Sequence, residues 1–339
     1  MRRWPILLLA LALGLALLAT CAPAGDELER QAALYESIVW PEPPQQARIR
    51  LVGVFGEPEE LGIRQSFLGR LWGWIAGAEA RNMVRPYAIA VNGARLAVAD
   101  PGVGAVHLYD MAGGDYERIE WAGEQLLQSP VGVAFVGDAL YVADSALGRI
   151  FVFDAEGELT RTIEGLDRPT GLAWDPRAGR LYVTDTLRHG IVVLDADGKR
   201  LFEFGGRGSG DGQFNFPSHL TLAGGRLYVN DTMNFRVQTF DMDGNFVSAF
   251  GSHGDGSGDF SQPKGVGVDG EGHIYVVDAL FNRVQIFDEE GQLLLAFGGD
   301  GALPGEFWLP SGMYINENRI YVADSYNRRV QIFQFLGGT

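Results

Sequence analysis

The chain has 339 residues, of which 46% are hydrophobic and 21% are charged, and its formal net charge is −16. Its 47 glycines and its low share of charged residues are typical of a globular protein built on strands and turns rather than on long helices. Because nucleic-acid binding requires Lys and Arg to displace counterions, the negative charge excludes nucleic acid as a partner, and it disfavours anionic bilayer surfaces.

Residues 1–20 are predicted to be an export signal. Arg2 and Arg3 precede an apolar run from Ile6 to Ala19, which is shorter than the roughly 20 residues that a membrane-spanning helix needs. A cleaved signal fits this pattern better than a retained membrane anchor, so the fold is expected to begin after residue 20.

Cys21 is the only cysteine of the chain, and it directly follows the apolar run. The four residues that end there, LATC, resemble the bacterial lipobox, in which processing leaves a lipid-modified cysteine at the new N-terminus. Thr20 departs from that motif, because Gly, Ala or Ser usually precedes the cysteine, and ordinary cleavage after Ala24 is the alternative. The resemblance implies a membrane anchor at Cys21, with the charged, proline-rich residues 21–47 as a tether. Ala22 after the cysteine resembles outer-membrane sorting, which implies a periplasmic lipoprotein held at the bacterial outer membrane.

Six similar segments follow the tether. Each contains a short strand that ends in Asp, as in YVAD, and aligning the chain on these aspartates gives spacings of 44, 41, 46, 47 and 46 residues. The aligned residues are Asp100, Asp144, Asp185, Asp231, Asp278 and Asp324. Repeats of 40–50 residues made of short alternating strands are typical of propeller blades, which are stable only against their neighbours.

Each repeat has the same order of predicted strands. A proline precedes the first strand, the second ends in the repeated Asp, the third follows a turn, and the fourth tends to end in Phe-Gly. The sixth repeat lacks a fourth strand, but residues 48–56 carry the Phe-Gly ending before the first repeat begins. We therefore expect an all-β, six-bladed propeller of four-stranded antiparallel blades over residues 48–339, closed by residues 48–56 pairing with the last repeat.

The pattern of repeats four to six, residues 218–334, resembles the NHL repeat, and repeats one to three match it more loosely. The motif Asp-x-x-Asn-x-Arg-Val-Gln carries the resemblance: Asn234 and Asn327 stand at the usual Asn position, and Asn282 stands one residue late. The resemblance implies a six-bladed propeller, a fold that hosts many activities. An Arg five residues after the Asp predicts an ion pair that fixes the turn in four repeats: Asp144 with Arg149, Asp231 with Arg236, Asp278 with Arg283, and Asp324 with Arg329.

No cofactor or metal is predicted. Metal-dependent lyases that this fold resembles use several histidines over the central channel, whereas only His219 of the five histidines here stands at a first-strand position. No unique carboxylate marks a calcium site of the lactonase kind, and no Ser has an activating context. The glycine-rich loops 205–217, 251–263 and 298–310 recur once per repeat and are interpreted as connections in which glycine supplies positive φ rather than as phosphate or metal cradles.

Residues that differ from blade to blade at the start of the first strands are the candidates for ligand binding. They are predicted to surround the mouth of the channel, and they are Arg85, Tyr87, Arg168, His219, Lys264 and Trp308. Residues 58–84 interrupt the repeats and carry apolar side chains at helical spacing. A helix there either caps the end of the propeller or offers a docking face to a membrane-bound partner.

The sequence thus predicts an exported, non-enzymatic binding or scaffold propeller with a protein partner in the cell envelope. An enzyme of the metal-dependent lyase or lactonase kind, centred on His219, is the alternative. Binding of a carbohydrate or other small molecule is the third reading, for which Tyr87, Phe214 and Trp308 are the aromatic candidates.

Overall fold

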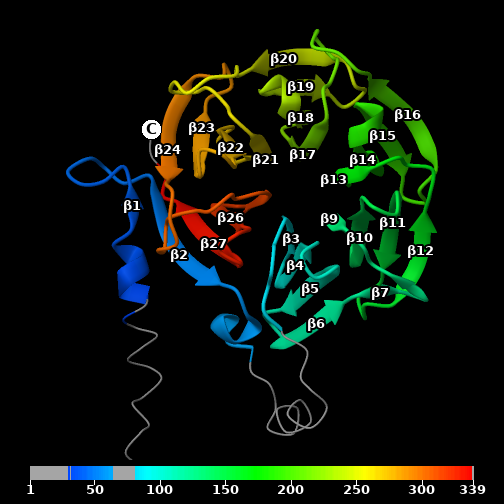
Figure 1. Cartoon of the computed structure of the whole chain (residues 1–339), viewed down its shortest axis with the longest axis horizontal. Coiled ribbons are helices and arrows are strands. Elements are labelled where there is room, and N and C mark those ends of the chain that lie inside the picture. Colours follow the sequence, from blue (N-terminus) through cyan, green and yellow to red (C-terminus); the bar gives the residue numbers. More distant parts are fainter. Residues whose placement is uncertain (1–29, 31, 64–80, 338–339) are drawn as a thin grey trace, which may run out of the picture.

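The structure is a computed structural model that describes residues 30, 32–63 and 81–337, and within them it is a six-bladed β-propeller (Figure 1). Each blade is an antiparallel sheet whose first strand lines the central channel and whose fourth strand lies at the circumference. The predicted fold class is confirmed. Among the described residues, no helix is both long and apolar enough to cross a membrane.

The first three blades follow one another along the chain. Blade one contains β3 (Ala88–Asn92), β4 (Arg95–Asp100), β5 (Ala105–Asp110) and β6 (Asp115–Ile119). Blade two contains β9 (Pro130–Val136), β10 (Ala139–Asp144), β11 (Arg149–Phe153) and β12 (Leu159–Ile163). Blade three contains β13 (Pro169–Asp175), β14 (Arg180–Asp185), β15 (Gly190–Asp195) and β16 (Arg200–Gly205).

The last three blades repeat this order. Blade four contains β17 (Pro217–Ala223), β18 (Arg226–Asp231), β19 (Arg236–Asp241) and β20 (Phe246–Phe250). Blade five contains β21 (Pro263–Val268), β22 (Ile274–Asp278), β23 (Arg283–Phe287) and β24 (Leu293–Gly298). Blade six contains β25 (Met313–Asn316), β26 (Arg319–Asp324), β27 (Arg329–Phe335) and, from the other end of the chain, β2 (Ile49–Phe55).

Strand β2 closes the ring as predicted. It pairs antiparallel with β27, from Ile49 opposite Phe335 to Phe55 opposite Val330. The N–H of Leu336 also donates to the carbonyl of Arg48, at 2.8 Å, so the two strands end side by side. The closing strand covers an edge of blade six that would otherwise be unpaired.

The segment before β2 differs from the expected tether. Residues 32–36 are helical, and β1 (Val39–Trp40) adds a fifth strand to blade six by pairing with β2. The Trp40 ring packs against Phe297 and Phe333 at centroid distances of 5.7 and 5.8 Å, and Tyr35 is buried in the same cluster. The described part of residues 21–47 is therefore held against the propeller by aromatic packing, so the packed domain begins before residue 48.

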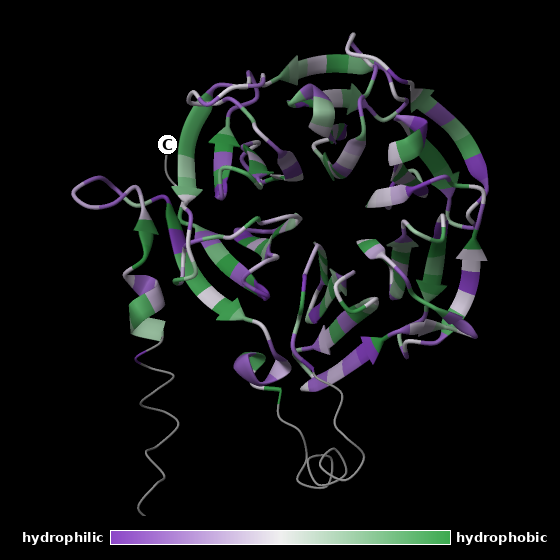
Figure 2. Cartoon of the chain, viewed as in Figure 1, coloured by the Kyte–Doolittle hydropathy of each residue, from purple (hydrophilic) through white to green (hydrophobic). Residues whose placement is uncertain are grey.

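Apolar residues recur along the strands of every blade (Figure 2), and they form six separate clusters. Each cluster lies between two neighbouring blades; one example joins Val98 of blade one to Tyr321 of blade six. Because no blade encloses a core of its own, the repeated sequence stabilises the fold only when all six copies are present.

The remaining elements are short. A two-stranded hairpin, β7 (Trp121–Ala122) and β8 (Gln125–Leu126), follows blade one, and the 3₁₀ segments are η1 (Pro58–Leu61), η2 (Thr186–Arg188) and η3 (Thr232–Asn234). Ile63 and Met83 are buried between blades six and one. Most of the predicted helix in 58–84, together with the signal 1–20 and Cys21, lies outside the described residues.

The glycine-rich loops have a structural role, as predicted. In each of them a phenylalanine is fully buried against the preceding fourth strand; these residues are Phe214, Phe260 and Phe307. Gly205 has a φ of +107°, and a Cβ there would meet the Phe214 ring at 2.6 Å. Glycine is therefore required both for the backbone conformation and for the space.

Candidate functional site

The six repeated aspartates hold the loops that enter the channel. Each is fully buried at the end of a second strand, and each accepts backbone N–H groups from the residues just before the first strand of its own blade. Asp100 accepts the N–H of Arg85 at 2.9 Å, Asp185 that of Arg168 at 2.8 Å, and Asp324 that of Trp308 at 2.8 Å. The repeated framework thus fixes the backbone of three residues that the sequence assigns to the mouth.

The predicted Asp–Arg pairs form in two of the four repeats. Arg236 Nε lies 2.9 Å from Asp231, and Arg329 Nε lies 2.7 Å from Asp324. In both repeats the Asn three residues after the Asp donates to the same carboxylate oxygen as the Arg.

The other two predicted pairs are wrong. Arg149 instead pairs with Glu164 at 3.0 Å, and Arg283 donates to the carbonyl of Phe281. Neither turn has Asn at the third position, and there the carboxylate accepts the N–H groups of its own turn instead. An Arg five residues after the Asp thus pairs with it only where the complete Asp-x-x-Asn-x-Arg motif is present, whereas in blade three Arg188 pairs with Asp185 from three residues on, at 3.0 Å.

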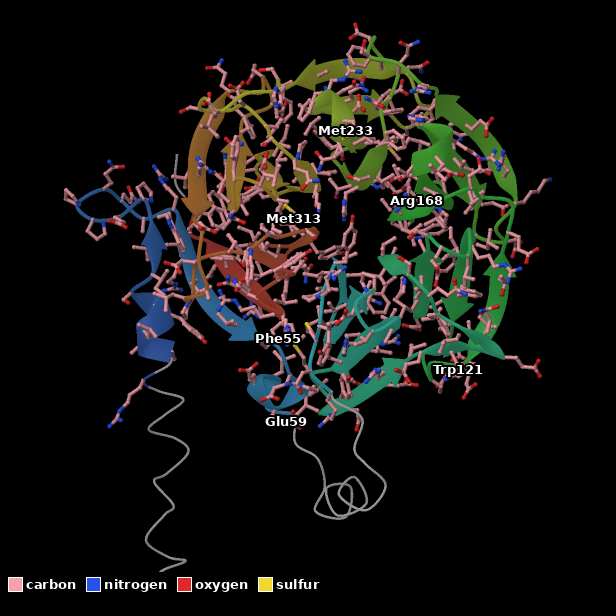
Figure 3. All side chains as sticks on the ribbon, viewed as in Figure 1. Phe55, Glu59, Trp121, Arg168, Met233 and Met313 are labelled. Atoms are coloured by element: carbon pink, nitrogen blue, oxygen red, sulfur yellow. The ribbon has the colours of Figure 1, made fainter. Side chains whose placement is uncertain are left out.

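The six mouth candidates lie together on one face of the propeller. Lys264 Nζ lies 5.6 Å from the centre of the Tyr87 ring, and this ring stacks on His219 at 5.3 Å. On the other side, the Arg85 guanidinium lies 5.5 Å from the ring of Tyr326, which packs on Trp308 at 5.6 Å. Arg168 of blade three and Met313 of blade six lie on opposite sides of the channel (Figure 3).

The nearby charges that act on the side chains of Lys264 and Tyr87 are positive. Burial lowers the pKa of Lys264, and the charge of Arg85 lowers it further. Burial raises the pKa of Tyr87, which the charge of Arg168 offsets in part. Within the described residues no ion pair involves Arg85, Arg168 or Lys264, so the mouth is a positive site on an acidic protein.

His219 lies at the floor of the mouth and is neutral at physiological pH. Its side chain is buried, and this burial, with the nearby charge of Lys264, lowers its pKa to about 3. The hydroxyl of Thr232 donates its single proton to the carbonyl of Pro263, at 3.1 Å. In the 2.7 Å hydrogen bond between Thr232 and Ser218, the Ser218 hydroxyl must therefore be the donor.

The Ser218 oxygen can then only accept, and it takes the proton on His219 Nδ1, at 3.4 Å. The Nε2 atom of His219 is thereby left as an acceptor, and it has no hydrogen-bond partner among the described residues.

A cavity of about 310 Å³ continues below His219 along the channel. Its walls come mainly from the inner strands, and they combine apolar side chains such as Val133, Leu172 and Val266 with exposed polar groups. The stacked rings of Tyr87 and His219 thus lie between the cationic mouth and this inner cavity.

An exposed apolar rim lies beside the mouth on blades three to six, and sequence reasoning missed it. Two residues after the repeated Asp, the side chains of Leu187, Met233, Leu280 and Tyr326 are 45–55% exposed. The register places this turn beside the start of the first strand, for example Asp231 opposite Pro217, so the rim and the mouth share one face. Comparing this one position across the repeats would have found the rim.

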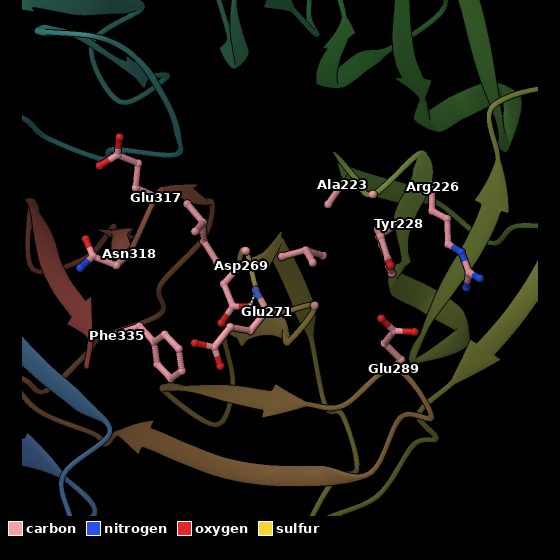
Figure 4. A pocket seen from close by; sticks show the side chains of 14 residues that line it. Ala223, Arg226, Tyr228, Asp269, Glu271, Glu289, Glu317, Asn318 and Phe335 are labelled. Carbon is pink, nitrogen blue, oxygen red and sulfur yellow. Dashed lines mark hydrogen bonds between the residues drawn. The ribbon is translucent and has the colours of Figure 1, made fainter. Parts of the chain in front are cut away.

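Another hollow lies on the opposite face, where the first and second strands of blades four to six are joined. It measures about 820 Å³ and is lined by acidic side chains, among them Glu271, Glu289 and Glu317 (Figure 4). Asp269 in its wall already accepts hydrogen bonds from His273 and Tyr275. The described residues contain no group of three His, Cys, Asp or Glu side chains arranged to hold a metal ion.

Three family models match successive parts of the chain. Residues 96–203 match the SMP-30/gluconolactonase/LRE-like region, residues 214–280 match a six-bladed β-propeller family, and residues 307–333 match the NHL repeat. The chain is a six-bladed β-propeller that carries an NHL repeat at residues 307–333. The expected resemblance is thus confirmed, although no curated protein sequence matches this propeller.

Solved structures share the fold at low sequence identity. Virginiamycin B lyase from Staphylococcus aureus is 14% identical, with a TM-score of 0.56, over 75% of this chain and 96% of its own. Hydrazine synthase from Kuenenia stuttgartiensis is 17% identical, with a TM-score of 0.56, over 75% and 77%. A chain of a nidogen/laminin complex is 22% identical, with a TM-score of 0.52, over 63% and 80%. At these identities the propeller shares only the fold of these proteins, and a shared fold does not carry a function with it.

Proposed function

We propose that this propeller is a non-enzymatic binding module of the bacterial cell envelope that holds a protein partner at the mouth of its channel. The observation that carries the proposal is the cationic mouth, where Arg85, Arg168 and Lys264 have no ion pair within the described residues. Positive side chains held together without counter-charges favour a partner that supplies them. The adjacent rim of exposed apolar side chains on blades three to six adds the contact area that such a partner needs.

Similar structures do not decide between binding and catalysis, because they include both a lyase and a chain of a protein complex. The residues of the mouth favour binding. His219 is the histidine that reaches the channel floor, and a single imidazole cannot form a metal site of the several-histidine kind. Carbohydrate binding has less support than the sequence suggested, since Phe214 is fully buried and belongs to the core between blades three and four.

The position of the propeller in the cell is part of the same proposal. Cleavage at Cys21 and lipidation of this residue would tether the propeller to the outer membrane on its periplasmic side. Net negative charge keeps the domain away from anionic headgroups, so that its mouth stays available to a partner.

Site-specific photo-cross-linking in intact cells tests the proposed function. A cross-linking side chain at Met233, on the rim, is expected to give a discrete adduct with a protein partner, and one at Val247 is the matched control. Both residues belong to blade four and are similarly exposed, at 50% and 42%, but Val247 lies on the circumference. The adduct should disappear when Arg168→Glu is added.

Cell fractionation completes this experiment, since the chain should be found in the membrane fraction and Cys21→Ser should release it. Equal adducts from the two positions, or none from Met233, would contradict binding at the mouth. A Cys21→Ser chain that stays in the membrane fraction would contradict the anchor.

A further inference from the structure

The chemistry of the mouth also indicates what kind of partner segment it binds, an inference that rests on the proposed function. Three cations from blades one, three and five converge on a mouth that a single short segment could fill. Lys264 is partly buried beside Tyr87, so a ligand must displace little water from it. Carboxylate groups fit such a site, because each can accept hydrogen bonds from both Arg and Lys.

The second observation is the free acceptor at the floor. His219 Nε2 is buried and has no partner among the described residues, and it lies close to Gly312 of blade six, so a ligand reaches it only by entering between these two residues. Because an acceptor cannot pair with a carboxylate, the ligand must also carry an N–H or O–H donor. A peptide chain supplies both, with carboxylates on its side chains and N–H groups on its backbone.

The third observation is the apolar rim. Leu187, Met233 and Leu280 are each at least half exposed, and Trp308 is 51% exposed beside Tyr326. These side chains extend over blades three to six, a wider arc than a small carboxylic acid could contact. A peptide in which apolar residues flank an acidic one could place its apolar side chains on this rim while its carboxylate enters the mouth.

Other anionic partners fit less well. A nucleic acid carries its charges along a whole strand and would meet acidic side chains outside the mouth, in a chain whose net charge is −16. An anionic bilayer is disfavoured for the same reason. The combination of a small cationic centre and a broad apolar rim favours a short acidic segment with apolar neighbours.

We propose that the mouth binds a protein segment in which Asp or Glu alternates with apolar residues. The carboxylates contact Arg85, Arg168 and Lys264, a backbone N–H donates to His219 Nε2, and the apolar side chains pack on Met233, Leu280 and Tyr326.

Isothermal titration calorimetry of the purified protein with defined peptides tests this inference. The blocked peptide SLDFDLS is expected to bind, and the matched amide peptide SLNFNLS to bind at least about tenfold more weakly, since one lost charged contact corresponds to roughly that factor. The double variant Arg168→Gln with Lys264→Gln should weaken binding of SLDFDLS by at least about tenfold as well. Arg177→Gln is the control, because Arg177 belongs to blade three but lies at the turn on the opposite face.

His219→Phe adds a test of the floor, because phenylalanine keeps the ring stack on Tyr87 but removes the acceptor. It should weaken binding several-fold without lowering the thermal unfolding midpoint. Equal binding of the two peptides, or unchanged binding by the double variant, would overturn the inference. Binding of phosphatidylglycerol vesicles in place of the peptide would also overturn it. If the cross-link at Met233 forms while no acidic peptide binds, the ligand class is wrong and the proposed function stands.

Discussion

A chain that begins at residue 57 is expected to lose its cooperative unfolding transition. This truncation removes β2, whose side chains Ile49, Leu51 and Phe55 are at most 1% exposed, and it leaves β27 as an open edge. Burying three such side chains contributes roughly 5–9 kcal/mol, which is comparable with the whole stability of about 5–15 kcal/mol of a typical domain. Thermal unfolding followed by circular dichroism measures the effect, with a chain that begins at residue 48 as the control, so that the two chains differ only in the closing strand.

Moving the closing strand to the other end of the chain should restore the unfolding transition. Residues 48–56 can be attached after residue 337 through a short glycine turn, because Ile49 and Phe335 are already paired and would become the ends of a hairpin. The transposed chain should regain the unfolding transition of the control. A truncated chain that unfolds at the same midpoint as the control would contradict closure by β2.

Asp231→Ala is expected to destabilise the protein by about 3–5 kcal/mol, the range for removing one partner of a buried charged network. Asp231 is fully buried and accepts hydrogen bonds from the backbone N–H of Asn215 at 2.6 Å and from the side chains of Asn234 at 2.8 Å, Arg236 at 2.9 Å and Gln238 at 3.1 Å. Its loss leaves these donors unpaired in the interior, which costs their desolvation.

Asp241→Ala is the matched control, because Asp241 belongs to the same blade and accepts three hydrogen bonds, but in an exposed hairpin turn. We expect its loss to cost about 1 kcal/mol, as for ordinary hydrogen bonds near the surface. Urea unfolding of both variants gives the two free energies. Equal destabilisation would show that the repeated Asp has no special structural role.

Most of the fold could be predicted from the sequence, because the strand pattern of one blade occurs six times. Six copies of one strand pattern define the blades, and the missing fourth strand of the last copy predicts the closing role of residues 48–56. The packed segment around Trp40 was missed, since a two-residue strand has no periodicity and its neighbourhood is rich in proline and charge. It is held by aromatic contacts with blades five and six that no local pattern records.

The candidate site could be predicted only in part. Inner strands begin at the channel, so residues at that position, such as Arg168 and Lys264, were placed near the mouth from the repeat alone. The tautomer of His219 depends on hydroxyl groups of Ser218 and Thr232, and their partners become known only when the blades are assembled. Likewise, Arg149 follows its Asp at the same spacing as Arg236 but pairs elsewhere, because its turn lacks the Asn that completes the motif.

Metal content distinguishes a channel mouth that binds a partner without a metal from a metal-dependent enzyme centred on His219. Elemental analysis of the purified wild-type protein and of His219→Ala, after dialysis without chelators, gives the stoichiometry. If the mouth is a binding site, we expect no stoichiometric metal in the wild type or in His219→Ala, and an unchanged fold in the variant. A metal bound at one ion per chain and lost in His219→Ala would contradict this expectation and would indicate a metal-dependent enzyme.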